Sequence, residues 1–214
     1  QSMNSSGTER MRAGAALFRR ELSAYFQTPV AYVVGAVFLA ASAALFFSIF
    51  FIYERVEMRQ FFSYLPLLLA LLMPALSMRL IAEERRRGTW EILTTLPLRN
   101  LEIVLAKFFA VWITGLFFLA PTVIYAITVS SLGPLDPGPV VGGYIGTVFL
   151  MAAYAAIGIF ASSLARNETV ALVTGLVITL FLALLDSFLL LIPTGLLPVF
   201  EFISIGHHFS DFAK

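Results

Sequence analysis

The chain has 214 residues, of which 59% are hydrophobic and only 13% are charged, and its mean hydropathy is +0.90. A soluble domain carries about 45–50% apolar and about 25% charged residues, and one of this size could not bury such an apolar excess. The composition therefore excludes an ordinary soluble protein and indicates an integral membrane protein. The net charge of +1 and the absence of cysteine favour neither a nucleic-acid partner, a disulfide framework nor a thiolate metal site.

The N-terminal part of the chain predicts an amphipathic helix. Residues 1–9 read as a tag remnant or a disordered end. Residues 10–28 then form a helix that lies in the lipid headgroup layer, either as an anchor or as an elbow that couples the bundle to motion at the membrane surface, and Pro29 ends it. Its apolar side carries Ala15, Phe18, Leu22, Tyr25 and Phe26, and its polar side carries Arg12, Arg19, Arg20, Ser23 and Gln27.

Residues 30–192 predict a transmembrane bundle. A bilayer-crossing helix needs about 20 mostly apolar residues, and continuous apolar runs indicate helices because barrel strands alternate. We therefore expect an all-α, polytopic integral membrane protein with five visible spans. The five stretches are Val30–Ile52, Phe61–Ile81, Phe108–Val129, Gly143–Leu164 and Val170–Ile192.

Basic residues predict the orientation of the bundle. With the N-terminus in the cytoplasm, all but three of the 14 Lys and Arg residues lie on the cytoplasmic side, as the positive-inside rule favours. An odd number of spans places the C-terminal end outside. Residues 193–214 contain too many Pro and Gly residues for a full crossing, so we expect a re-entrant or interfacial segment on the outer face. We also expect a sixth span to be missing at the C-terminus.

The cytoplasmic segment 82–107 holds the most informative pattern. Five consecutive charged residues, Glu83 to Arg87, should continue the second span as a helix. Gly88 then interrupts that helix. Thr89 is a natural N-cap and Glu91 suits the first turn of a new short helix, which Pro97 ends.

This short helix would present Trp90 and Leu93 on one side. Such a side could lie in the groove of a partner protein, or it could rest on the membrane interface, where Trp is common. The residues alone do not separate the two.

The pattern Glu83-Glu84-x-x-x-Gly88-Thr89-x-Glu91-x-Leu93-x-Thr95-x-Pro97, followed by Lys107, resembles the signature of type-2 ABC exporter permeases. Within that family, Phe18-Arg19-Arg20-Glu21-Leu22 with Tyr25-Phe26 and Pro29-Val30-Ala31-Tyr32 is similar to the gliding-motility permease subgroup. The resemblance implies a helical bundle of the permease kind in the bacterial plasma (inner) membrane, multi-pass, with a cytoplasmic N-terminus.

The same resemblance implies a function. The chain would be the membrane permease subunit of an ATP-binding cassette transporter, an exporter, that pairs with an identical or related second permease. Cytosolic ABC ATPase subunits would bind ATP and Mg. This chain would bind no cofactor itself, and its other partner would be membrane lipid. The residues implied to contact the ATPase subunit are Glu83, Glu84, Arg87, Gly88, Thr89, Trp90, Glu91 and Leu93.

The sequence lacks the P-loop pattern G-x-x-x-x-G-K-[ST], so we expect a permease without its own ATPase motif and not an enzyme. An alternative is a scaffold or mechanotransmitter that the same ATPase drives without transport. A weaker alternative is an intramembrane hydrolase with an E-E-x-x-x-R pattern, but Gly88 occupies the arginine position. The remaining candidate ligands, His207 and His208, fall near the opposite face, so we expect neither catalytic residues nor a metal site.

One ionisable residue, Asp186, falls well inside a predicted span. A carboxylate at the bilayer centre costs about 2.5–3.5 kcal/mol on insertion scales, so it should face the protein interior or water. It could be a hydrogen-bonded structural residue near the outer interface, or it could belong to a substrate path or a dimer interface.

Overall fold

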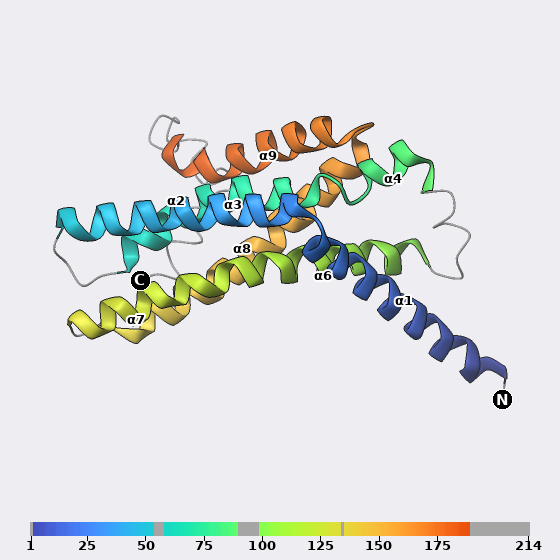
Figure 1. Ribbon diagram of the computed structural model, residues 1–214, viewed down its shortest axis with the longest axis horizontal. Helices are drawn as coiled ribbons and strands as arrows, with labels where there is room; N and C mark the ends of the chain where they lie inside the picture. The colour runs from blue at the N-terminus through green and yellow to red at the C-terminus, as the bar shows by residue number, and fades with distance from the viewer. Residues whose placement is uncertain (1, 54–57, 90–98, 134, 189–214) are drawn as a thin grey trace, which may run out of the picture.

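The computed structural model describes residues 2–53, 58–89, 99–133 and 135–188, with side chains for 13–48, 58–89, 99–133 and 135–185 (Figure 1). Over these ranges all the regular secondary structure is helical, which confirms the expected all-α class. The helices are α1 (Ser2–Gln27), α2 (Pro29–Tyr53), α3 (Arg59–Ser77), α4 (Ala82–Arg87), α6 (Asn100–Leu119), the 3-10 turn η1 (Ala120–Thr122), α7 (Val123–Leu132), α8 (Pro137–Leu164) and α9 (Glu168–Phe188).

Five stretches of the described chain are long and apolar enough to cross a membrane, in agreement with the expected number. They are Pro29–Ser48, Arg59–Arg87, Asn100–Leu132, Pro137–Leu164 and Glu168–Leu185. The segment 193–214, expected on the outer face, lies outside the described residues.

The helices of the third and fourth spans, α6 and α8, begin earlier than expected. Helix α6 begins at Asn100 instead of Phe108, and α8 begins at Pro137 instead of Gly143. Both extensions come from helix caps that a hydropathy window does not register. The Glu102 carboxylate accepts a hydrogen bond of 2.9 Å from the backbone N–H of Arg99. At the start of α8, the Asp136 side chain accepts a hydrogen bond of 3.0 Å from the Gly138 N–H. Asp136 directly precedes Pro137, the first residue of this helix.

The centre of the bundle is α3, which packs against α2, α6, α8 and α9. Its side chains Leu65, Leu69 and Met73 are fully buried. Pro74 has no N–H to give to the Ala70 carbonyl, so the helix ladder is incomplete there. Another span fills the gap, because the Thr179 hydroxyl of α9 donates to the Ala70 oxygen at 2.8 Å.

The elements that were expected to face the cytoplasm gather at one end of the bundle. Figure 1 shows α1, α4, the start of α6 and the α8–α9 turn at this end, with α7 and the end of α2 at the other. Helix α1 leaves the bundle obliquely, and it begins at Ser2, so it includes most of the residues set aside as a tag remnant or disordered end. Segments far apart in sequence therefore meet where α4 leaves the bundle.

Candidate coupling site

Helix α4 is a short charged helix with a break in the helical backbone on each side, the turn 78–81 before it and Gly88 after it. Glu83–Arg87 extends the second span as expected, because α3 and α4 both lie in one candidate membrane span, Arg59–Arg87. The extension is not one unbroken helix, since α3 ends at Ser77 and residues 78–81 form a turn before α4. The predicted interruption at Gly88 is confirmed. Gly88 adopts a left-handed conformation with φ of 69°, and its N–H bonds to the Arg85 carbonyl at 3.2 Å. Glycine reaches this conformation without the steric cost of a Cβ atom, so it is the natural end of the helix.

One side of α4 is tied to the start of α9 by ion pairs. Glu83 pairs with Arg79 at 3.0 Å and also with Arg87, each one helical turn away. Glu168, the first residue of α9, pairs with Arg79 at 3.2 Å and with Arg86 at 2.9 Å. These pairs form one network of alternating charges between the turn that follows α3, α4 and the start of α9. A network of this kind holds more firmly than an isolated surface pair.

The other side of α4 is tied to α6 and α1 through a buried lysine. Lys107 of α6 has a fully buried side chain, and its ammonium lies 2.9 Å from Oε1 of Glu84 and 3.2 Å from Oε1 of Glu21. The two carboxylate side chains are only 11% and 12% exposed. A buried charge requires such partners, because desolvation of an unpaired ion is costly. We call Glu21, Lys107 and Glu84 the charge triad.

Helix α1 packs on the bundle instead of resting only on lipid. Leu17 is buried against Ile103 and Ala106 of α6, and the Phe18 ring packs beside them. The Tyr25 hydroxyl donates to the Leu76 carbonyl of α3 at 2.8 Å. Burial raises the pKa of the Tyr25 phenol, the negative charge of Glu21 raises it further, and Arg79 opposes the shift. The phenol therefore stays neutral and keeps its proton for this hydrogen bond.

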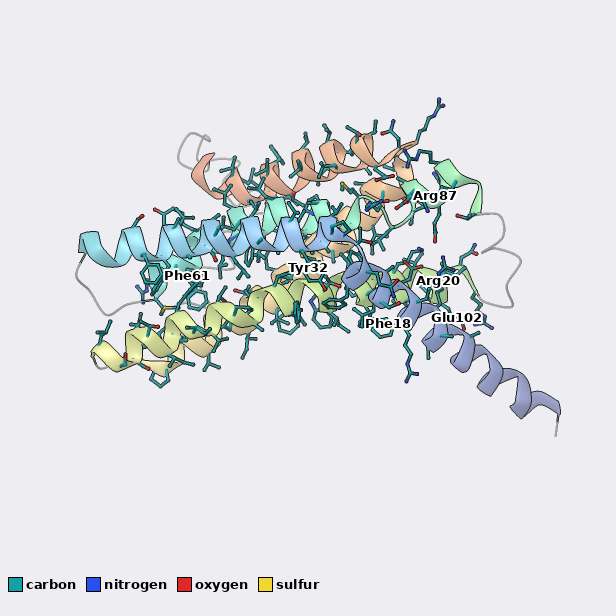
Figure 2. The ribbon with its side chains drawn as sticks, viewed as in Figure 1. Phe18, Arg20, Tyr32, Phe61, Arg87 and Glu102 are labelled. Carbon is teal, nitrogen blue, oxygen red and sulfur yellow. The ribbon has the colours of Figure 1, made fainter. Side chains whose placement is uncertain are left out.

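A cavity of about 380 Å³ lies between α1 and the α3–α4 region. Apolar side chains from the spans line one part, among them Ala31 and Leu76, and charged side chains line the rest. Figure 2 shows Arg20 on α1 and Arg87 on α4 at this end of the molecule. Glu21 and Glu84 of the charge triad also line this cavity, one from α1 and the other from α4.

A family model described as ABC-2 family transporter protein matches residues 31–213. This chain belongs to the ABC-2 transporter family. It is the membrane permease subunit of a transporter of this type, and such subunits lack an ATPase and work with ABC ATPase subunits. No curated protein and no solved structure matched the chain.

The structure of the permease brings five of the expected coupling residues together. Glu83, Glu84, Arg87, Gly88 and Thr89 lie on α4 or directly after it, and the Thr89 hydroxyl donates to the Glu84 carbonyl at 3.3 Å. The remaining three, Trp90, Glu91 and Leu93, lie outside the described residues. The last candidate, Asp186, belongs to α9, but its side chain is outside the described part.

Sequence reasoning missed the charge triad of the permease. It treated Lys107 as a cytoplasmic cation that follows the family signature and Glu21 as part of a subgroup motif, without pairing the two. The available signal was a lone lysine within an apolar helix, because such a residue needs a buried carboxylate partner. Within the described residues, no three His, Cys, Asp or Glu side chains are grouped so that they could hold a metal ion.

Proposed function

We propose that this permease pairs with a second, identical or related permease to export a substrate across the bacterial plasma membrane, and that the segment 82–107 docks on a cytosolic ABC ATPase subunit. The ATPase subunits supply the work by binding ATP and Mg. The observation that carries the proposal is the position of α4, which is tied to α9 on one side and to α6 and α1 on the other. A force on the segment that follows α4 would therefore reach several spans.

The proposed movement starts at Trp90, Glu91 and Leu93, which directly follow α4 in sequence. When the ATPase subunits close on ATP, they push on these residues and displace α4. The Glu84–Lys107 pair carries this displacement to α6, and the Glu168 pairs carry it to α9. Tilting of these helices is a switch between two packings of the bundle, biased by nucleotide.

The distribution of charge supports a cytoplasmic N-terminus for the permease. Arg79, Arg86 and Lys107 all belong to the end of the bundle where α1 and α4 lie. By the positive-inside rule this end faces the cytoplasm, on the same side as the ATPase subunits. Labelling of a single cysteine introduced near the N-terminus, from either side of inverted vesicles, checks the orientation.

The first test is purification of the permease in detergent, to find whether an ABC ATPase subunit co-purifies with it. We expect a stable complex whose ATPase activity rises when transport occurs. Trp90→Ala should reduce transport per ATP hydrolysed without lowering membrane insertion, because hot-spot aromatic residues dominate the energy of a docking contact. Tyr64→Ala is the matched control, since Tyr64 is an exposed aromatic residue on α3, near the start of that helix. Unchanged coupling in Trp90→Ala contradicts the docking role.

Membership of the gliding-motility subgroup is a finer part of the proposal. It is supported by the motif Phe18-Arg19-Arg20-Glu21-Leu22, in which Glu21 is the residue that pairs with Lys107. Some members of such a subgroup could move a structure at the cell surface instead of a substrate. Substrate flux into inverted vesicles decides, because a mechanotransmitter would hydrolyse ATP without flux.

A role for Asp186 in the substrate path or the interface between two permeases is also proposed. Its motivation is the cost of a carboxylate in an apolar span, which favours a functional reason for its presence. Asp186→Asn keeps the size and removes the charge. Full transport activity of this variant would show that the residue is structural.

A further inference from the structure

Helices α3 and α4 belong to one candidate span, Arg59–Arg87. Residues 78–81 interrupt the helix between them, and we call this segment the α3–α4 joint. Residues 78–81 form a turn, in which the N–H of Leu80 bonds to the Ser77 carbonyl and the N–H groups of Ile81 and Ala82 have partners outside the helical ladder. Non-helical backbone inside a bilayer protein requires hydrogen-bond partners from neighbouring protein. The identity of that partner shows what holds the bend.

The partner is a single hydroxyl from another span. Ser162 of α8 accepts hydrogen bonds of 3.1 Å from the backbone N–H groups of both Ile81 and Ala82. The same hydroxyl donates to the Met78 carbonyl at 3.1 Å. A serine hydroxyl has one donor and two acceptor positions, so this contact uses its full capacity. Ser162 is fully buried.

Close packing of α8 on the end of α3 makes this contact possible. Gly158 lies one turn before Ser162, and a Cβ atom at this glycine would stand only 2.3 Å from Oγ of Ser77. The small residues Ala161 and Ala82 are fully buried in the same region. The backbones therefore approach closely enough for a short side chain to reach the turn.

We propose that Ser162 is a positioning residue, whose hydroxyl holds the α3–α4 joint bent and makes α4 move together with α8 when the ATPase pushes on the coupling segment. The coupling part of this inference rests on the proposed function, whereas the bend is a property of the permease alone. Without the hydroxyl, the Met78 carbonyl and the N–H groups of Ile81 and Ala82 lose this partner, and Ala82 follows Met78 by the four residues that an α-helical hydrogen bond spans. The natural result is a continuous helix from α3 into α4, which turns α4 away from α8.

The bend can be measured in the full permease without any ATPase. The sequence contains no cysteine, so spin labels can be attached at introduced cysteines without a background. Arg87→Cys on α4 and Phe149→Cys on α8 are suitable sites, because both side chains are well exposed. Phe149 lies 13 residues from Ser162, which places the second label about 20 Å along α8 from the joint.

We expect one narrow distance distribution for the labelled parent in lipid nanodiscs, and a broader or shifted one for Ser162→Ala. Ser163→Ala is the matched control, because that half-buried residue's hydroxyl donates to the Phe160 carbonyl of its own helix and not to the α3–α4 joint. Ser162→Thr keeps the hydroxyl and should restore the parent distribution. If Ser162→Ala gives the same distribution as Ser163→Ala, the positioning role is refuted, whatever the fate of the proposed function.

A second measurement tests the consequence for coupling. In the complex with its ATPase, Ser162→Ala should lower transport per ATP by about tenfold, because the bent joint loses the hydroxyl that pairs two backbone donors and one carbonyl. The KM for ATP should not change, because the nucleotide site lies in the other subunit. If Ser162→Ala changes the spin-label distance but not the transport per ATP, the residue holds the bend, and its role in transport is refuted.

Discussion

Removal of the lysine at the centre of the charge triad should destabilise the permease strongly. Lys107→Met keeps the length and apolar character of the side chain but removes its ammonium. In the structure this ammonium is 1% exposed and lies 3.2 and 2.9 Å from the carboxylates of Glu21 and Glu84. Without it, two carboxylates that are 11% and 12% exposed face each other with no cation between them.

The size of this effect follows from the cost of an uncompensated buried charge. Loss of one partner from a buried ion pair costs about 3–5 kcal/mol. For a protein of this length, each kcal/mol lowers the Tm by about 2–4 °C, so we expect a decrease of about 6–20 °C. The cost includes the repulsion between the two remaining carboxylates, which a second substitution can remove.

Thermal unfolding of the detergent-solubilised permease, followed by fluorescence, provides the assay. Arg86→Met is the matched control, because it removes a cation that is 57% exposed and should cost only about 0–1 kcal/mol. Adding Glu84→Gln to Lys107→Met should recover part of the lost stability, since it removes one unpaired charge. Equal Tm values for Lys107→Met and Arg86→Met, or a further loss on adding Glu84→Gln, would refute the account of the triad.

Two further substitutions test how the spans pack. Gly158→Ala places a Cβ atom 2.3 Å from Oγ of Ser77 and should cost about 1–3 kcal/mol by overpacking, whereas Gly14→Ala meets nothing within 4 Å and should leave the Tm unchanged. Thr179→Val keeps the shape of the side chain but leaves the Ala70 carbonyl without the hydroxyl that bonds it at 2.8 Å. Its expected cost is about 1–3 kcal/mol in the same unfolding assay, and a neutral result would show that another group satisfies the carbonyl.

The number and helical nature of the spans could be predicted from the sequence because lipid imposes them. A long apolar run must satisfy its own backbone hydrogen bonds, and a helix does so within the run. The end of α4 at Gly88 could also be predicted from the sequence, because it depends on the conformational freedom of a single residue. The starts at Asn100 and Pro137 were missed because helix caps extend a helix beyond its apolar stretch.

The contacts that define the coupling site were decided only by the tertiary structure. Lys107 finds partners 23 and 86 positions away, and the Ser162 hydroxyl reaches backbone groups 80 to 84 positions away. Such pairs depend on which helix faces meet, and apolar faces in lipid do not specify their neighbours by hydropathy. The sequence by itself determined a five-span helical protein with a charged segment between the second and third spans. Helix packing decided which buried polar groups hold that segment in place, because burial leaves each of them only the partners within its reach.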